Sequence, residues 1–183
     1  MNPEPAGVLG SIWIRPTGNA LDSIKHAVRI ACENAGGPPV QPHVSLMGGI
    51  EITTDIATKL KTLAARIRGF EIRLGKIQWR GEYYRSLFVS VELSDELMAA
   101  HLAAHEEFGR LPSAPFEPHV SLLYGDFDET FKKELAKQLG DRLDVRFTAG
   151  ALDLVNACEK VPIAQWETLH QAMLRSAPIK EKT

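Results

Sequence analysis

Two nearly identical stretches, PHVSLMGG at residues 42–49 and PHVSLLYG at residues 118–125, decide how this chain is organised. His43 and Ser45 of the first stretch correspond to His119 and Ser121 of the second, at a constant separation of 76 residues. In both stretches the polar His and Ser alternate with apolar residues. Because residues two apart on a β-strand point to the same side, each stretch predicts a strand that carries His and Ser on one face.

The residues around these stretches follow the same order of elements twice. A helix over 19–35 is indicated by apolar Leu21, Ile24, Val28 and Ala31 on one side, with Gly36 to end it. The other predicted elements are strands at 7–14, 70–79, 86–93, 146–155 and about 164–173, and helices capped at Thr53 and Thr54 (to 67), at Ser94 (to about 110) and at 128–139. A shift of 76 residues lays strand on strand and helix on helix, which indicates an internal duplication.

This order predicts one α+β domain over residues 1–183 with a bilobal, duplicated fold. Two antiparallel sheets would face each other across a central cleft, with the helices outside. The pseudo-symmetric lobes would span approximately 1–80 and 81–183, and exchange of strands between them is left open. No linker rich in Gly or Ser separates the halves. A pseudo-two-fold axis would bring both His-x-Ser faces into the one cleft.

The overall charge restricts the partners of the chain. It carries a formal net charge of −2 with His neutral, and 44% of its 183 residues are hydrophobic. This balance disfavours a broad basic face for duplex nucleic acid but allows a small anionic substrate in a pocket. No apolar run approaches the ~20 residues of a membrane span, and residues 1–10 lack the pattern of a signal peptide. We therefore expect a cytoplasmic monomer without a membrane partner.

The two motif histidines have the chemistry that opening a phosphodiester requires. An imidazole has an ordinary pKa of about 6.5, so one ring can accept a proton from water while the other donates one to the leaving oxygen. Ser45 and Ser121 can donate hydrogen bonds to the non-bridging phosphate oxygens. The symmetry of the two motifs leaves open whether His43 or His119 is the base.

Metal chemistry is not indicated. Neither motif histidine has a third Cys, His, Asp or Glu at metal-ligand spacing beside it, so we expect no metal and no cofactor. Cys32 and Cys158 form no CxxC motif and predict free thiols, with their pairing left open. The remaining histidines are predicted to be surface or hydrogen-bonded structural residues: His26, His101, His105 and His170.

The twin His-x-Ser motifs, each followed by an apolar residue, resemble the signature of the 2H phosphoesterase superfamily. Within it the chain is similar to the cyclic phosphodiesterase family known from plants and fungi. SIWIRP at 11–16 resembles that family's opening strand, PHVSLLYG its second motif and WETL at 166–169 its closing strand. Ser45 stands where Thr is common, which keeps the hydroxyl, and the two cysteines do not reproduce the disulfides of the plant members.

The resemblance implies a specific reaction on a small-molecule cyclic phosphate. The expected activity is metal-independent opening of 2′,3′-cyclic nucleotides to 2′-phosphates, or of ADP-ribose 1″,2″-cyclic phosphate to ADP-ribose 1″-phosphate, or of both. Two alternatives stay open. One is an RNA-end-processing or 2′-5′ RNA ligase-like member, which the charge of −2 disfavours. The other is a non-catalytic nucleotide-binding module, although all four motif side chains are present.

Two further residues are candidates for substrate binding. Tyr124 of the second motif would contact phosphate or ribose. Trp13 lies on the opening strand, on the side opposite to Ile12 and Ile14, and would either stack on a base or belong to the core. Arg85 could attract phosphate, but it is interpreted as a solvated loop residue. Further aromatic residues border a loop that could cover the site, at Trp79, Tyr83 and Tyr84.

Overall fold

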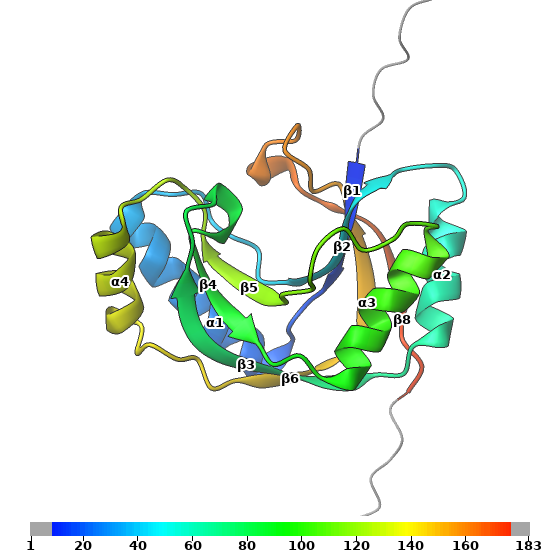
Figure 1. Ribbon diagram of the computed structural model, residues 1–183, viewed down its shortest axis with the longest axis horizontal. Coiled ribbons are helices and arrows are strands. Elements are labelled where there is room, and N and C mark those ends of the chain that lie inside the picture. The colour runs from blue at the N-terminus through cyan, green and yellow to red at the C-terminus, as the bar shows by residue number, and fades with distance from the viewer. Residues whose placement is uncertain (1–8, 177–183) are drawn as a thin grey trace, which may run out of the picture.

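Eight strands of the described chain, residues 9–176 of a computed structural model, form two antiparallel sheets of four strands each. The first sheet has the order β2-β1-β7-β8, with strands at Val44–Glu51, Leu9–Ile14, Ala151–Val155 and Thr168–Met173. The second has the order β5-β4-β3-β6, with strands at His119–Leu123, Leu87–Val91, Phe70–Trp79 and Arg146–Ala149. The sheets face each other with helices on their outer sides (Figure 1), so the predicted α+β fold is confirmed.

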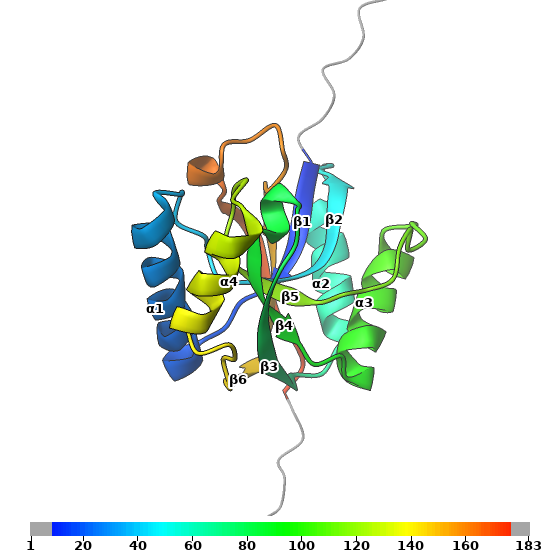
Figure 2. The same ribbon diagram turned by 60° about the vertical axis from the view of Figure 1, so that its left-hand side comes forward.

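Four α-helices of the described residues cover the outer faces of the two sheets (Figure 2). Two of them, α1 (Gly18–Ala35) and α4 (Glu129–Gln138), pack on the second sheet. The other two, α2 (Ile56–Arg66) and α3 (Asp95–Glu107), pack on the first. None of these helices combines the length and apolar character needed to cross a membrane.

The helix ends show which capping signals were interpreted correctly. Ser94 caps α3 as predicted, since its hydroxyl accepts a hydrogen bond from the Leu97 amide at 3.2 Å. The predicted cap of α2 is wrong, because the helix starts after Asp55 and the Thr53 hydroxyl donates to the Asp55 carboxylate instead. In addition, α3 ends at Glu107 rather than near 110, where Gly109 has a positive φ of 62°.

The two sheets do not correspond to residues 1–80 and 81–183. Strand β3 belongs to the first half of the sequence but lies in the second sheet, and β7 and β8 of the second half lie in the first sheet. A short connection joins β3 to β4, which favours pairing of these neighbours across the boundary between the repeats. Each sheet is therefore built from both repeats.

The predicted strand at 146–155 is two strands. It breaks at Gly150, where the chain passes from β6 in one sheet to β7 in the other. The predicted final strand also begins later than expected, because residues 163–165 form a helical turn. Asn156 holds this turn, since its side chain accepts from the Glu167 amide at 2.7 Å and donates to the Gln165 carbonyl at 3.2 Å.

The strand β1 is covered on both faces, and this positions the candidate site. Ile12 and Ile14 have no exposed surface, and Trp13 on the opposite side is 1% exposed. Trp13 lies opposite Ser45 in the antiparallel pairing of β1 with β2. Residues 7 and 8 of the predicted first strand, and residues 1–8 of the segment considered for a signal peptide, lie outside the described residues.

Candidate active site

A cavity of about 320 Å³, here called the central cavity, opens between the two sheets. The six residues singled out from the sequence all line it: His43, Ser45, His119, Ser121, Trp13 and Tyr124. Three of them come from β1, β2 or the residue before β2, and three come from β5 or the residue after it. The two sequence repeats therefore meet at one cavity.

The His43 ring is held from two sides. Its Nδ1 lies 2.6 Å from the carbonyl oxygen of Gln41, and its ring stacks on Trp13 with centroids 3.5 Å apart. Burial lowers the pKa of His43 to about 3, the positive charge of Arg15 adds to this effect, and the Gln41 carbonyl opposes it. His43 is therefore neutral near pH 7 in the free protein.

His119 is held in the same way but is less deeply buried. Its Nδ1 lies 3.0 Å from the carbonyl oxygen of Glu117, and its ring meets the ring of Phe88 edge to face. Burial lowers the pKa of His119 below its ordinary value, and the charge of Arg85 lowers it further. The nearby carboxylates of Glu117 and Glu82 act in the opposite direction and favour the protonated ring.

Both imidazoles thus bind, through Nδ1, the carbonyl two residues earlier in the chain. A carbonyl oxygen only accepts, so the hydrogen-bond network assigns the proton of each neutral ring to Nδ1 and leaves a lone pair on Nε2. Within residues 9–176, Nε2 of either ring has no hydrogen-bond partner. Each ring is oriented with its reactive nitrogen available to a ligand.

The two motif serines differ in their surroundings. Ser121 is 4% exposed and donates to the carbonyl oxygen of Tyr84 at 3.1 Å. Ser45 is only partly buried, and its hydroxyl has no partner among the described residues. Ser45 can therefore donate to a ligand directly, whereas Ser121 has to release the Tyr84 carbonyl first.

Trp13 supports the His43 ring instead of offering a free surface to a base. It is 1% exposed, its ring is parallel to that of His43 within 7°, and Trp166 meets it edge-on at 5.9 Å. Of the two interpretations left open for Trp13, stacking on a base and packing in the core, the structure shows the ring packed against His43 and Trp166. Sequence alternation placed Trp13 on the cavity side of β1, but it could not show that His43 covers it.

Aromatic rings form the wall behind the second motif. Tyr124 is 3% exposed, and burial raises the pKa of its phenol to about 12, so it stays a neutral hydrogen-bond donor. Tyr84 and Trp166 pack around it, with ring centroids 5.3 Å and 6.0 Å from that of Tyr124. Tyr84 was considered only as a loop residue, and Trp166 only as part of the WETL segment that carries the family resemblance.

For Arg85 the sequence interpretation favoured a solvated loop over a contact with phosphate, and this preference is wrong. Arg85 lines the central cavity and is not a solvated loop residue: its side chain is 21% exposed, its Nε is buried without a partner, and one terminal nitrogen donates to Glu117 at 2.8 Å. The turn of Tyr83–Arg85 folds back because the Gly125 amide donates to the Tyr83 carbonyl. A net charge near zero gave no signal of this local cation.

In the described chain the two cysteines form no disulfide, and the buried His101 has a hydrogen-bond partner of its own. Cys32 and Cys158 are both free thiols, and only Cys158 lines the central cavity. His101 is buried and satisfied, since its Nδ1 lies 2.8 Å from the Leu46 carbonyl and its ring stacks on Phe116. Within residues 9–176, His, Cys, Asp and Glu form no cluster of three suited to holding a metal ion.

Comparison with known proteins places the chain in a family. The model of the 2′-5′ RNA ligase superfamily matches residues 16–159, which is most of the chain. The protein belongs to this superfamily, the 2H phosphoesterases. The resemblance carried by the twin motifs is thereby confirmed.

Two curated relatives cover nearly the whole chain. The cyclic phosphodiesterase of Arabidopsis thaliana is 24% identical over 165 residues, which are 87% of this chain and 91% of that protein. The 2′,3′-cyclic-nucleotide 3′-phosphodiesterase of Yarrowia lipolytica is 21% identical over an alignment of 213 residues, with coverages of 87% and 96%. Distant homologues of this chain are therefore cyclic phosphodiesterases.

The fold is similar to that of LigT from E. coli. Apo LigT superposes with a TM-score of 0.63 at 16% identity, over 91% of this chain and 96% of LigT. LigT has also been solved in complex with 3′-AMP, with a TM-score of 0.59. At this level of identity the likeness establishes the shared architecture of facing four-stranded sheets.

Proposed function

We propose that this protein hydrolyses cyclic phosphodiesters, opening 2′,3′-cyclic nucleotides to 2′-phosphates, ADP-ribose 1″,2″-cyclic phosphate to ADP-ribose 1″-phosphate, or both. The observation that carries the proposal is that His43 and His119 line the same cavity and are oriented in the same way. Each ring is hydrogen-bonded through Nδ1 to a backbone carbonyl, so that its Nε2 is available to a ligand in the central cavity. The relatives from Arabidopsis thaliana and Yarrowia lipolytica and the nucleotide complex of LigT support the substrate class.

The reaction needs one proton removed and one supplied. Nε2 of the base takes a proton from water, and the water oxygen attacks phosphorus. The bond from phosphorus to one ring oxygen breaks, and Nε2 of the acid protonates that leaving oxygen as an alcohol. The non-bridging oxygens gain negative charge on the way, which fixed donors stabilise. Ser45, Ser121 and Tyr124 are neutral donors around the cavity, and Arg85 supplies a positive charge.

The surroundings of the two rings favour His43 as the base and His119 as the acid. His43 is the more deeply buried, and its pKa of about 3 keeps it unprotonated near neutral pH. His119 is more exposed and has two carboxylates that favour its protonated form. A bound phosphate carries negative charge and raises the pKa of both rings, so the first proton goes to His119.

The test is turnover of adenosine 2′,3′-cyclic phosphate and of ADP-ribose 1″,2″-cyclic phosphate in excess EDTA. We expect hydrolysis by the wild type, 2′-AMP as the product from the nucleotide, and a loss of about 10²–10⁴ in kcat in both His43→Ala and His119→Ala. The exposed His26→Ala serves as the matched control. Activity that requires added metal would contradict the mechanism, and a folded wild type without turnover would favour a binding module.

One observation favours a second candidate, an enzyme acting on RNA ends. A cavity of about 300 Å³ shares Ser45, Gly48, Arg85 and His119 with the central cavity and continues it toward Arg110. A second phosphate group fits an extension that carries two arginines. Turnover of a dinucleotide ending in a 2′,3′-cyclic phosphate, compared with the mononucleotide, separates the two candidates: a kcat/KM at least about tenfold higher for the dinucleotide would favour the RNA-end substrate.

A further inference from the structure

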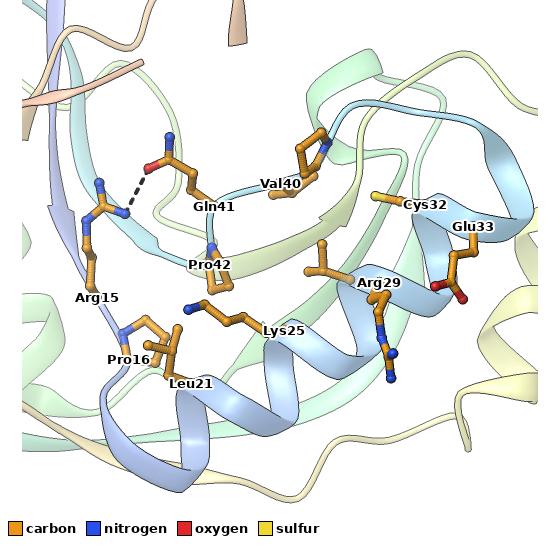
Figure 3. A pocket seen from close by; sticks show the side chains of 12 residues that line it. Arg15, Pro16, Leu21, Lys25, Arg29, Cys32, Glu33, Val40, Gln41 and Pro42 are labelled. Atoms are coloured by element: carbon orange, nitrogen blue, oxygen red, sulfur yellow. Dashed lines mark hydrogen bonds between the residues drawn. The ribbon is translucent and has the colours of Figure 1, made fainter. Parts of the chain in front are cut away.

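A second cavity, of about 570 Å³, lies between α1 and the segment 38–42 that leads into β2 (Figure 3). We call it the α1 cavity. It is larger than the central cavity and shares no lining residue with it. Its wall comes from the end of β1, one side of α1 and the proline-rich segment before His43. The proposed reaction uses none of the side chains in this wall.

Half of the twelve residues that line the α1 cavity are apolar. They are Pro16, Leu21, Val28, Pro39, Val40 and Pro42. Prolines hold the chain in a restricted conformation, so two sides of the cavity are formed before any ligand arrives. A concave apolar wall with a few polar groups is the usual form of a small-molecule site.

Lys25 is a cation in the wall of the α1 cavity that has no counter-ion among the described residues. Figure 3 shows its ammonium group between Pro42 and Leu21, in the space between α1 and the segment 38–42. Lys25 forms no ion pair with the carboxylates of residues 9–176. Arg15, by contrast, is neutralised by Asp153 at 2.6 Å.

The other charged residues of the wall do not replace this missing partner. Arg29 points away from the segment 38–42 in Figure 3, and its guanidinium lies 2.9 Å from Nδ1 of His26. Within residues 9–176 Glu33 is the one carboxylate that lines the cavity, but it stands eight residues beyond Lys25 on α1. At 1.5 Å per residue the two side chains start about 12 Å apart, beyond the screening length of ordinary salt. Among the described residues Lys25 and Arg29 of this wall both lack an ion pair, and of these two the Lys25 ammonium is the one that Figure 3 shows between α1 and the segment 38–42.

We propose that the α1 cavity binds a small amphipathic anion, with its single acidic group at Lys25 and its apolar body against Leu21, Val28 and Val40. A carboxylate, a sulfonate or a phosphate monoester satisfies the same ammonium group. A neutral compound of the same shape cannot form the ion pair and should bind more weakly. A strongly polar compound should also bind more weakly, because its polar groups would have no hydrogen-bond partners against the apolar wall.

The α1 cavity is joined to the catalytic ring through Gln41. The Gln41 side chain lines the cavity, accepts from Arg15 at 3.0 Å and donates to the Trp166 carbonyl at 3.0 Å. Its own backbone carbonyl holds Nδ1 of His43 at 2.6 Å. If the proposed function holds, an anion in this cavity acts on kcat through the orientation of His43, without entering the central cavity.

The binding test uses two dyes of nearly equal shape and different charge. The anionic dye is 1-anilinonaphthalene-8-sulfonate, and N-phenyl-1-naphthylamine is its neutral counterpart. Fluorescence titration of the full chain gives both affinities for the wild type, Lys25→Gln, Leu21→Trp and the control Lys133→Gln on the exposed side of α4. Lys25 and Lys133 are both exposed, so these two variants keep the fold.

We expect Lys25→Gln to lower the affinity for the anionic dye by about fivefold, which is the effect of one partly exposed ion pair. Its affinity for the neutral dye should not change. Leu21→Trp fills the cavity and should lower the affinity for both dyes, while Lys133→Gln should change neither affinity. Excess 2′-AMP should not displace the dye. Three results would overturn the proposal. The anionic dye could bind the wild type and both cavity variants with equal affinity, it could be displaced by 2′-AMP, or it could fail to bind at all.

The fluorescence result does not depend on turnover, so it stands apart from the proposed function. Where the wild type hydrolyses the cyclic nucleotide, the same dye should change kcat by at least about twofold in the wild type and not in Leu21→Trp. A dye that binds as expected but leaves kcat unchanged would overturn the link through Gln41 alone. A protein that binds the dye and hydrolyses nothing would contradict the proposed function and keep the cavity assignment.

Discussion

The ring of Trp13 lies flat against the ring of His43, with centroids 3.5 Å apart and planes within 7° of parallel. Trp13 lies on β1 and His43 directly precedes the neighbouring strand β2, and the carbonyl of Gln41 holds the histidine through its Nδ1. Because stacking and one hydrogen bond already fix the ring, His43 loses little orientational freedom when substrate binds in the proposed reaction. The same contact also shields His43 from water, which keeps the ring unprotonated.

Trp13→Leu tests this relationship. Without the stacked ring His43 gains freedom and solvent, so kcat should fall by about 10–100-fold with a much smaller change in KM. The pKa of His43 should rise from about 3 toward its ordinary value, which NMR titration of the imidazole carbon signals would measure. Trp13→Phe keeps an aromatic face, so its kcat and the pKa of its His43 should both lie close to the wild-type values. A control is Trp79→Phe, since Trp79 does not line the central cavity.

The two serines should not behave alike. Ser45 is free to donate to substrate, so Ser45→Ala should lower kcat by about 10²-fold at unchanged stability. Ser121→Ala should lower kcat as well and should also cost about 1 kcal/mol of unfolding free energy, because the Tyr84 carbonyl loses its donor. Urea denaturation beside steady-state kinetics separates the two effects. Equal stability losses in both variants would contradict the assigned hydrogen bond.

The pH dependence of kcat/KM follows from the two pKa directions. In the proposed mechanism the active form has His43 unprotonated and His119 protonated, so activity should be lost on the acid side only near pH 3. It should fall as the pH rises through the pKa of His119, which lies below 6.5. Weakly acidic conditions should therefore give the highest kcat/KM, as a profile from pH 3 to 9 would show.

Arg85→Gln should move only one limb of that profile. Arg85 lowers the pKa of His119, so its removal should raise that pKa and shift the fall in activity to higher pH. The maximum value of kcat/KM should fall too, because a cation near the phosphate is lost. A shift of the acid limb instead would reverse the assignment of acid and base.

The ion pair of Arg15 with Asp153 should matter more than the pairs on the surface. Asp153 is 4% exposed and bonds Arg15 at 2.6 Å and Gln171 at 2.8 Å. Asp153→Asn leaves the Arg15 charge uncompensated and should cost about 2 kcal/mol, less than for a fully buried pair because Arg15 is partly exposed. Arg66→Gln, which breaks an exposed pair with Glu106, should change the unfolding midpoint little. Urea titration of both variants measures the contrast.

Much of the candidate site could be predicted because it rests on short-range patterns. The alternation of polar and apolar residues in the two repeated segments placed His43 on the same strand face as Ser45, and His119 on the same face as Ser121. The repeat predicted that both pairs share one cavity. Arg85 could not be placed in this way. Its position depends on a turn that is pinned to Gly125, forty residues later in the chain, and no local periodicity reports such a contact.

The sequence by itself determined the two motif strands, most helix boundaries and the resemblance to the superfamily, because spacings of two and of three to four residues act within a single element. Tertiary structure alone decided that β3 and β7 change sheets, that Gly150 divides one predicted strand, and that Trp13 lies beneath His43. It also decided how far burial moves each histidine pKa. These features depend on which distant surfaces exclude water together, and that is settled only when the sheets pack.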